Sequence, residues 1–392
     1  MRICHLCLNG PYNEGWNYQE NILPKYHALQ GNDVYQIVTP YIWEGTQLKE
    51  STDKEYTNEH GVHIYRCFAK KGLIGGIRFN RYPEVYSLLE KINPEILFIH
   101  DVQCLDMTVV AKYLKNHPRC IVYADNHSDF SNSARNWISK NILHKIIWKR
   151  MANIIEPYVK KFYGVLPARV DFLINVYGLP KDKVELLVMG ADDLLVNKAK
   201  QELSIKDIRG KYSIEKDDFL IMTGGKIDLF KTQTLLLMQA VHNIRNEKVK
   251  LIVFGSVAPE LKEKIADLSD GKKVQYIGWI EANDSYDYFA TADLVVFPGR
   301  HSVFWEQVAG MGIPMIVKYW DGTTHIDGGG NVEFLNDDSV DEITEKILKI
   351  SSDELHYKTM KNAAEQISKK FSYSSIAQRS ICEESEYDEF SN

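Results

Sequence analysis

The sequence predicts an α/β protein of two domains, each built on a doubly wound parallel sheet. The chain has 392 residues, which is too long for one ordinary hydrophobic core. Short apolar runs rich in β-branched residues alternate with helical patterns along nearly the whole chain. Such alternation is typical of parallel sheets covered by helices on both faces. The pattern restarts after residue 190, which indicates a second Rossmann-like sheet.

The first half contains seven strand-like runs, at residues 2–8, 33–38, 63–67, 95–100, 120–124, 163–166 and 184–188. Helical patterns separate them at residues 17–29, 82–92 and 107–116. The second half has five such runs, at residues 219–223, 249–254, 274–277, 294–297 and 315–317. Helical patterns lie between or after these, at residues 232–243, 259–266, 285–290 and 340–350. We expect domains at 1–190 and 191–370, with a helix at about 371–392 packing back on the first.

The composition is that of a globular protein, with 44% apolar and 26% charged residues. No apolar run reaches the roughly 18 residues needed to span a bilayer, and no signal-peptide pattern opens the chain. We therefore expect a cytoplasmic protein, with its six scattered cysteines as buried thiols. Residues 1–190 carry a basic excess, whereas the whole chain has a net charge of −6. This asymmetry indicates different partners for the two halves but is too small to indicate nucleic acid.

Glycines and lysines follow the first strand of the second half, in Gly224-Gly225-Lys226-Ile227-Asp228-Leu229-Phe230-Lys231. Two glycines allow close backbone approach, and two lysines five residues apart can bracket an anionic group. The spacing fits neither a Walker loop nor the dinucleotide fingerprint, so a solvated turn with surface lysines remains an alternative.

A second motif begins where the strand at 294–297 ends in a Pro, Gly, His and Ser loop. A helix follows, with Glu306 in its first turns, and Gly312-Ile313-Pro314 leads into the next strand. A helix N-terminus offers free N–H groups and a partial positive charge to a diphosphate. A carboxylate just inside that helix can accept hydrogen bonds from both hydroxyls of a ribose.

With these motifs in order, the chain resembles the GT-B glycosyltransferases of family 4, a retaining, glycogen-synthase-like and mannosyltransferase-like group. Further matching pieces are the Gly10–Gly15 loop, the Met189-Gly190-Ala191-Asp192 junction, Val274–Trp279 and Phe371-Ser372-Tyr373. The resemblance implies two Rossmann-like domains facing a central cleft. It implies catalytic roles for His127, Lys226, Lys231 and Glu306. It implies donor binding by Gly15, Gly225, Gly278, Trp279, Arg300, His301, Ser302, Val303 and Phe304.

One departure from the family pattern concerns its pair of glutamates separated by seven residues. Glu306 matches the second, which by resemblance binds the ribose, but the position of the first is Pro298. The contact that the first glutamate makes with the donor sugar would then come from Arg300, His301 or Ser302, or be absent.

Other polar residues crowd the predicted strand ends. His127 and Asp129 follow one strand, and His100 and Asp101 another. By resemblance, His127 would contact the transferred sugar; strand-end side chains satisfied by backbone are the alternative. Asp321 and His325, in a glycine-rich segment after the strand at 315–317, are further candidates for binding acceptor or sugar.

We find no convincing metal-ligand spacing, so we expect no metal and no cofactor beyond the nucleoside-diphosphate-sugar donor, with UDP or GDP as its nucleotide. The predicted activity is transfer of a sugar, with retention, to a glycan or lipid-linked acceptor in surface polysaccharide or glycoconjugate synthesis. A nucleotide-sugar epimerase of GT-B fold and a catalytically inactive sugar-nucleotide-binding partner are the alternatives. A dehydrogenase is disfavoured because no G-x-G-x-x-G follows the first strand.

Two basic and apolar segments in the first half indicate an anionic membrane surface as a further partner, so we expect a peripheral membrane protein. The first combines Arg66, Lys70, Lys71, Arg78 and Arg81 with Phe68, Leu73, Ile74, Ile77 and Phe79. The second lies at residues 137–163 and carries Trp137, Ile138, Lys140, Ile142, Lys145 and Ile146 among others. A helix packed on its own sheet is the alternative explanation.

Overall fold

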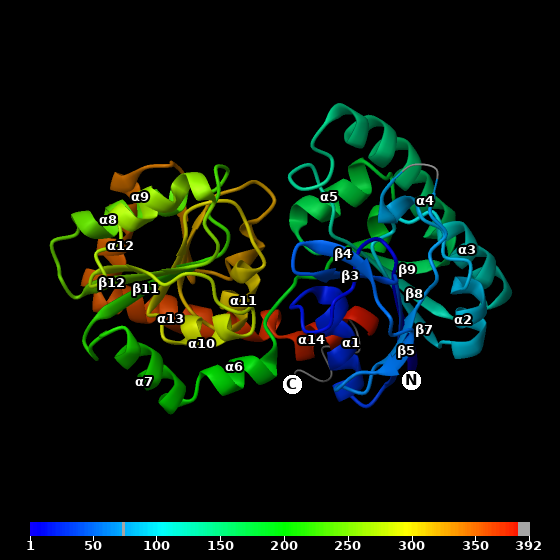
Figure 1. The fold of residues 1–392 in the computed structure, drawn as a ribbon, viewed down its shortest axis with the longest axis horizontal. Coiled ribbons are helices and arrows are strands. Elements are labelled where there is room, and N and C mark those ends of the chain that lie inside the picture. Colours follow the sequence, from blue (N-terminus) through cyan, green and yellow to red (C-terminus); the bar gives the residue numbers. More distant parts are fainter. Residues whose placement is uncertain (73–74, 383–392) are drawn as a thin grey trace. The chain divides into compact units, whose positions relative to one another are not determined.

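The computed structural model describes residues 1–72 and 75–382, which fold into two compact units (Figure 1). The first unit comprises Met1–Val188 and the residues from Ile376 onward, and the second comprises Met189–Ser375. The predicted helix at about 371–392 corresponds in part to α14 (Tyr373–Ile381), and residues 383–392 lie outside the described residues. The first unit is therefore assembled from two separate stretches of the chain.

The first unit contains an eight-stranded sheet in the order β10-β9-β8-β7-β1-β2-β6-β5. Neighbouring strands are parallel except for β5, which pairs antiparallel with β6. The strands are β1 (Arg2–Cys7), β2 (Asp33–Val38), β5 (Glu55–Thr57), β6 (His63–Arg66), β7 (Ile96–His100), β8 (Ile121–Asn126), β9 (Val159–Gly164) and β10 (Val184–Leu186). The strand order reverses direction between β1 and β7, so the edge beyond these two strands is the place where a doubly wound sheet binds ligands.

Helices cover both faces of this sheet. The helices are α1 (Gln19–Leu29), α2 (Val85–Ile92), α3 (Met107–Asn116), α4 (Lys149–Ile155) and α5 (Pro167–Asn175), with a π-helix at Ser139–Trp148 and short 3₁₀ turns at Ile77–Phe79, Glu156–Tyr158 and Lys181–Lys183. Side chains of α2, α3 and α4 share one core with the alternate residues Cys4 and Leu6 of β1. Helices α1 and α14 lie on the opposite face (Figure 1). That face receives His5, which lies between Cys4 and Leu6 and so points away from their core.

The second unit contains a six-stranded, all-parallel sheet in the order β13-β12-β11-β14-β15-β16. Its strands are β11 (Phe219–Gly224), β12 (Val249–Phe254), β13 (Val274–Tyr276), β14 (Leu294–Phe297), β15 (Met315–Lys318) and β16 (Val332–Leu335). Numbered within the unit, this order is 3-2-1-4-5-6, the Rossmann arrangement. The point where it reverses lies between β11 and β14.

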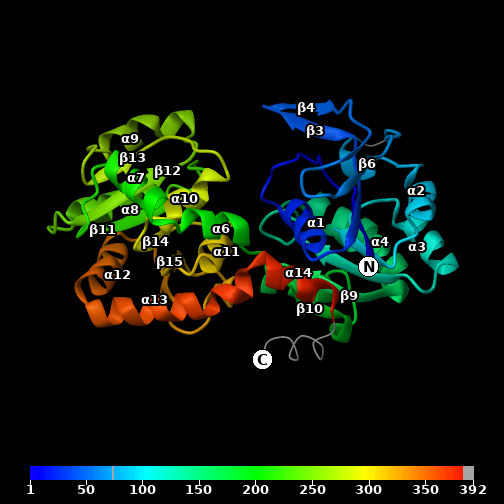
Figure 2. The same ribbon diagram turned by 90° about the horizontal axis from the view of Figure 1, so that it is seen from below.

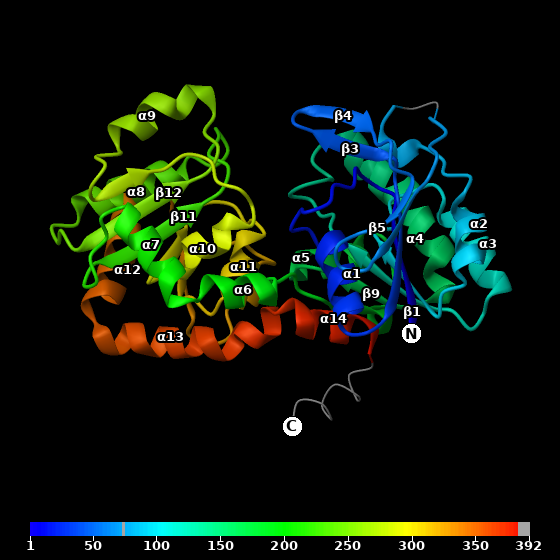
Figure 3. The same ribbon diagram turned by 60° about the horizontal axis from the view of Figure 1, so that its bottom comes forward.

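Eight α-helices of the described residues surround the second sheet: α6 (Asp193–Ala199), α7 (Glu202–Lys211), α8 (Gln233–Asn243), α9 (Lys262–Asp267), α10 (Asp284–Ala290), α11 (Phe304–Gly310), α12 (Val340–Ser352) and α13 (Glu354–Ser368). Three 3₁₀ turns, at Pro259–Leu261, Thr324–Ile326 and Lys369–Phe371, complete the unit. Apolar side chains of α8, α9 and α12 share one core with the sheet. Within this unit α9 lies on one side of β11 and β12, and α7, α10 and α13 lie on the other (Figure 3). Helices α12 and α13 follow one another along its edge (Figure 2).

Two segments that the family resemblance singled out pair with each other inside the second unit. Ala191 donates its backbone N–H to the Phe371 carbonyl at 2.8 Å, and Tyr373 donates to the Ala191 carbonyl at 3.0 Å. Gly310 packs against this junction so closely that a Cβ there would lie 2.7 Å from the Phe371 carbonyl oxygen. The junction residues and the Phe-Ser-Tyr segment thus form one structural feature.

The cysteine prediction was right for four of the six residues. Cys4, Cys7, Cys67 and Cys104 are buried, whereas Cys120 and Cys382 are only partly buried. Cys4 and Cys7 belong to different cores because they point to opposite faces of β1.

Candidate functional site

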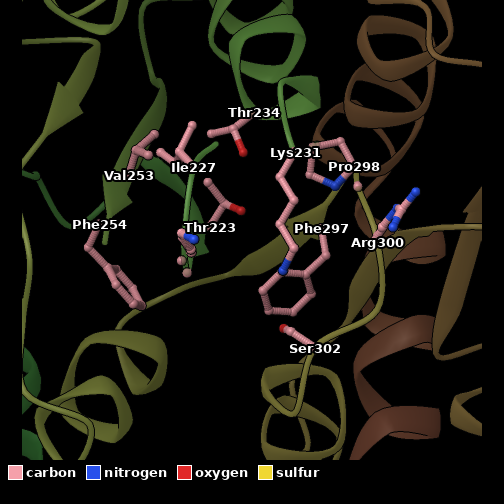
Figure 4. Close-up of a pocket in the computed structure, with 14 residues that line it drawn as sticks. Thr223, Ile227, Lys231, Thr234, Val253, Phe254, Phe297, Pro298, Arg300 and Ser302 are labelled. Carbon is pink, nitrogen blue, oxygen red and sulfur yellow. The ribbon is translucent and has the colours of Figure 1, made fainter. Parts of the chain in front are cut away.

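A pocket opens in the second unit at the point where its strand order reverses (Figure 4). Residues after β11 and after β14 line it, as expected for a doubly wound sheet. The lining consists of Thr223, Gly224, Gly225, Lys226, Ile227, Lys231, Thr234, Val253, Phe254, Phe297, Pro298, Gly299, Arg300 and Ser302. The pocket therefore brings together the two motifs that the sequence indicated.

Glycines make the floor of this pocket possible. A Cβ on Gly255, whose φ is +129°, would lie 1.8 Å from the Gly225 carbonyl oxygen, so the loops after β11 and β12 can meet only without that side chain. A Cβ on Gly224 would lie 2.1 Å from the Phe254 ring. Backbone hydrogen bonds hold the loops together, with Ile227 N–H donating to the Ser256 carbonyl at 2.8 Å. The loop that carries both lysines is therefore fixed by its neighbour.

Three cationic side chains belong to this pocket. Lys231 extends toward Ser302 beside Phe297, whereas Arg300 points away from it (Figure 4). Burial, together with the charges of Lys226 and Arg300, lowers the pKa of Lys231, although Asp228 opposes the shift. The Lys226 side chain is 68% exposed and pairs with Asp228 at 3.2 Å. Three cationic side chains around one pocket suit an anionic ligand.

A second hollow adjoins the first through Gly225, Lys226 and Phe254, which line both. Trp279, 63% exposed, and Phe304, the first residue of α11, also line it. Gly278 has a φ of +84° and accepts a hydrogen bond from Gly255 N–H at 2.7 Å. An exposed indole and a phenyl ring beside a cationic pocket offer apolar surface to a nucleotide base.

Glu306 is fully buried and lines neither pocket. Its Oε1 lies 2.7 Å from His301 Nε2 and 2.9 Å from His325 Nε2. A carboxylate only accepts, so both histidines carry a proton on Nε2. Burial would raise the pKa of Glu306, but His301 and His325 outweigh it and lower that pKa to about 2. Its Oε2 is buried without a hydrogen-bond partner among the described residues.

This trio also has the spacing of a metal site, because the candidate ligand atoms of His301, Glu306 and His325 lie within 4.8 Å of one another. Both imidazole Nε2 atoms contact the same carboxylate oxygen, whereas Glu306 Oε2 and His325 Nδ1 are buried without a hydrogen-bond partner among the described residues. The sequence did not predict that these three residues would meet.

The first unit holds a polar cluster where its own strand order reverses. Asp101, which follows β7, has a φ of +62°, and its backbone N–H donates to Asp125 Oδ1 at 3.0 Å. Asp101 Oδ1 in turn accepts from His127 N–H at 3.0 Å. His100 Nδ1 lies 2.8 Å from Asp125 Oδ2, and His127 Nε2 lies 3.4 Å from the same oxygen as an ion pair. A left-handed conformation at a non-glycine residue is strained, and such strain is concentrated at functional sites.

The charge on His127 follows from its neighbours. Burial would lower its pKa, but the carboxylates of Asp125, Asp101 and Glu20 outweigh burial and raise it to about 9. At neutral pH His127 is therefore an imidazolium held against Asp125. Such a group can donate a hydrogen bond to a sugar hydroxyl or stabilise developing negative charge.

Other predicted site residues lie apart from these clusters. Asp129 pairs with Arg169 at 3.2 Å and caps a turn, accepting from the backbone N–H groups of Ser131 and Asn132. Gly15 has a φ of +76° and lies in a loop of the first unit. Asp321 is exposed in a turn, and Val303 precedes α11 and lines neither pocket. Asp129 thus has a structural role that the sequence did not reveal.

Sequence reasoning missed Thr223 and Thr234, which place hydroxyls on the first pocket. Thr223 ends β11, and Thr234 lies at the start of α8 directly after the lysine motif. Hydroxyl residues at a strand end and a helix start are a usable signal for anion binding.

The region that contains the pocket is similar in sequence to a known protein family. Residues 218–353 match the model of the family Glycosyl transferases group 1. Within the second unit, this stretch is therefore similar to group 1 glycosyltransferases. No curated protein sequence matches the chain. Evidence on the fold of the whole chain comes from solved structures.

The whole chain has the GT-B fold. HepE from Anabaena in complex with UDP is 16% identical, with a TM-score of 0.66 over 97% of this chain and 98% of that one. WaaG, a glycosyltransferase involved in lipopolysaccharide biosynthesis, is 12% identical, with a TM-score of 0.63 over 96% and 98%. UDP-GlcNAc 2-epimerase from Neisseria meningitidis bound to UDP-GlcNAc is 13% identical, with a TM-score of 0.62 over 97% and 98%. The predicted two-domain α/β fold is confirmed, and the glycosyltransferase domain is the part of the chain that carries the family match.

Proposed function

We propose that this glycosyltransferase moves a sugar from a nucleoside-diphosphate donor to a glycan or lipid-linked acceptor in surface polysaccharide or glycoconjugate synthesis. The observation that carries the proposal is the cationic pocket at the reversal point of the group 1 domain. Lys231 and Lys226 lie on the loop after β11, and α8 begins beside them. This combination of ammonium groups and a helix N-terminus suits a diphosphate.

The nucleotide is proposed as UDP or GDP, with Trp279 and Phe304 beside its base. HepE and the Neisseria epimerase bind UDP and UDP-GlcNAc, which makes UDP the first ligand to test. Glu306 is proposed to hold the ribose, because a buried carboxylate oxygen without a partner gains a hydrogen bond when a hydroxyl approaches it. Gly15, Arg300, His301 and Ser302 remain proposed donor contacts on the family resemblance.

The reaction is proposed to proceed with retention and without an enzymic nucleophile. The bond between the anomeric carbon and the diphosphate breaks through an oxocarbenium-like state, and the acceptor oxygen attacks from the same face. The acceptor proton passes to the departing phosphate oxygen. The main catalytic task is to stabilise the negative charge of the leaving group, which falls to Lys231 and Lys226. His127 would donate to a hydroxyl of the transferred sugar.

No metal is assigned to this step, because the ammonium groups and the helix start can balance the diphosphate charge. The His301, Glu306 and His325 trio is where a bound ion would first be sought. Metal independence is therefore a separate proposal with its own test below.

The decisive experiment incubates the protein with UDP-sugars and GDP-sugars without acceptor and follows two products. Slow release of nucleoside diphosphate with free sugar supports a transferase, because water replaces the missing acceptor. Conversion of the donor to its 2-epimer supports the alternative of an epimerase of the same fold. Tight binding with neither product supports an inactive sugar-nucleotide-binding protein, the alternative raised by Pro298 at the position of the first family glutamate.

An anionic membrane surface is the proposed location of the acceptor. The two segments that suggested it differ in the structure, because cations of the first are buried or paired whereas the second is exposed. In the first segment, Arg66 is buried and donates to the carbonyls of Tyr12 and Thr39, and Arg81 pairs with Asp106 at 2.9 Å. Leu73 and Ile74 lie outside the described residues. The prediction that Arg66 is a surface cation was wrong, because its guanidinium ties loops of the first unit together.

The second segment supports the proposal better. Trp137, Ile138, Ile142 and Ile146 are 70%, 59%, 39% and 61% exposed. The π-helix brings residues four apart toward one face. Exposed cations lie among them, and the sequence has no acidic residue from Phe130 to Ile155. Exposed apolar groups with unopposed positive charge suit the surface of an anionic bilayer.

This association is proposed as peripheral, on the cytoplasmic face. Among the described residues no helix is both long and apolar enough to cross a bilayer.

A further inference from the structure

A continuous chain of buried imidazoles runs through the first unit from α14 to the polar cluster. His27 of α1 places Nε2 3.0 Å from the Ala377 carbonyl of α14, and its Nδ1 lies 3.0 Å from His5 Nε2. His5 Nδ1 lies 2.9 Å from His100 Nε2, and His100 Nδ1 lies 2.8 Å from Asp125 Oδ2. All four side chains are at most 3% exposed. Helices α1 and α14 lie side by side where the chain begins (Figure 3).

The two ends of this chain fix the number of protons it needs. The Ala377 carbonyl can only accept a hydrogen bond, so His27 Nε2 carries a proton. Ser380 Oγ lies 3.1 Å from His27 Nε2, but its hydroxyl proton is already donated to the Ala377 carbonyl. An ionised Asp125 can also only accept. Four hydrogen bonds then link three rings to two acceptors, and each bond needs one proton. Three neutral imidazoles supply three protons, so the chain holds one more.

Donors around Asp125 show that it is ionised. Besides His100, its Oδ2 faces the Gln19 amide nitrogen at 3.2 Å and His127 Nε2 at 3.4 Å. Its Oδ1 accepts the Asp101 backbone N–H at 3.0 Å. Burial would raise the pKa of Asp125, but His100 and His127 hold it well below its usual range. If Asp125 were protonated, its hydroxyl proton would point at one of these donors and displace a hydrogen bond.

The extra proton belongs on His100. Burial and the neighbouring histidines lower the pKa of His5 well below its usual range, and burial lowers that of His27 to about 4. His100 is the ring in direct contact with the carboxylate. Asp101, Glu20 and His127 are the other charged groups around Asp125, and Ser380 is the polar neighbour on α14.

We propose that His27, His5 and His100 form a positioning unit that keeps one excess proton on His100. This buried cation shares Asp125 with His127 and thereby sets how strongly His127 holds its own proton. The proton count rests on the geometry alone. Its consequence for catalysis rests on the proposed role of His127 as a donor to the sugar.

The direction of the effect follows from charge. Two cations, His100 and His127, contact one carboxylate oxygen. If His100 loses its extra proton, His127 becomes the only cation on Asp125 and binds its proton more tightly. The strength with which His127 holds its proton thus depends on the proton state of His100, its neighbour on Asp125.

The test is nitrogen-detected NMR of the full chain with labelled histidines, with peaks assigned through His5→Gln and His27→Gln. We expect four ring protons on His27, His5 and His100 at pH 7.5, with two of them on His100. One proton per ring would overturn the proposal, since a link would be broken or Asp125 protonated.

Two variants of His5 then test the coupling. Glutamine can accept from His100 and donate to His27, so His5→Gln should leave the titration of His127 within a few tenths of a pH unit. Leucine can do neither, so His5→Leu should remove the extra proton and raise the titration midpoint of His127 by about one pH unit. Equal midpoints in the two folded variants would overturn the coupling.

The pH profile of kcat/KM separates this proposal from the proposed function. Its basic limb should move upward with the His127 midpoint in His5→Leu and stay in place in His5→Gln. A midpoint that moves while the profile does not would remove His127 from the reaction and leave the proton unit intact.

Discussion

Replacement of Lys231 by methionine removes the half-buried ammonium group of the pocket while keeping most of its volume. Lys231 shares the pocket with Lys226 and Arg300, and their charges, with burial, lower its pKa. A diphosphate reverses this situation, because it brings negative charge to a cation that the empty pocket disfavours. Loss of one hydrogen bond to a charged group costs about 1.5–3 kcal/mol. At 1.4 kcal/mol per factor of ten, the Kd for UDP or GDP should rise roughly 10- to 150-fold.

Calorimetry of the folded variant without added metal measures this change. Lys226→Met should give a smaller loss, since that side chain is 68% exposed and paired with Asp228. Lys248→Met is the matched control, because Lys248 is similarly exposed and paired, with Asp217, but lies outside both pockets. A Kd for Lys231→Met within twofold of the unmodified protein would refute the diphosphate assignment. An equal loss in Lys248→Met would show that the effect is a general one of net charge.

Five further outcomes are expected. Glu306→Gln should weaken UDP binding much more than binding of its 2′-deoxy analogue, and equal losses would make the glutamate purely structural. The same change should lower the free energy of unfolding by about 3 kcal/mol at pH 7. Because the pKa of Glu306 is lowered in the folded protein, this difference is present above about pH 4 and fades as the pH falls toward 2. Urea titrations of both proteins at pH 7 and near pH 2 can check it. Gly255→Ala should abolish nucleotide binding or folding, because its Cβ would lie 1.8 Å from a carbonyl oxygen, and a normal Kd would contradict the pocket geometry. Activity should survive excess chelator, whereas loss restored by a divalent ion would place a metal in the mechanism. Lys140→Gln with Lys145→Gln should reduce co-sedimentation with anionic vesicles roughly 30-fold, at about 1 kcal/mol per charge, while paired changes at Lys262 and Lys264 should not.

Much of the fold could be predicted because its strands are buried on both faces. The runs at Asp33–Val38, Val249–Phe254 and Leu294–Phe297 are short, apolar and flanked by turns, and the structure gives them the same bounds. Helix α3 at Met107–Asn116 was also predicted to the residue, since its apolar positions follow the helical period.

Elements with weaker apolar patterns escaped prediction. The hairpin of β3 (Tyr41–Glu44) and β4 (Gln47–Glu50) is largely exposed and so has no alternating apolar face. Residues 193–211 were not among the predicted elements, yet they form α6 and α7, the first of which is capped by the Asp192 side chain. Strand β16 follows the glycine-rich segment and was not among the predicted strands.

Some residues of the candidate sites could also be predicted from the sequence, and others could not. Lys226 and Lys231 could be predicted because motif, strand end and helix start are contiguous in sequence. His5 and His27 could not, because their contacts join β1, α1 and α14, and the contact from His27 to Ala377 spans 350 positions. A histidine in the middle of an apolar strand was the only local signal.

The division of the first unit between the two ends of the chain has a consequence for its biosynthesis. A ribosome completes Met1–Val188 before it starts on the second unit, and Ala377 emerges only after that unit has been translated. At roughly 5–20 residues per second, this interval lasts on the order of 10–40 s. During it, His27 lacks the carbonyl that ends the imidazole chain, and the face later covered by α14 stays open. The nascent first unit therefore stays incomplete until α14 has been synthesised.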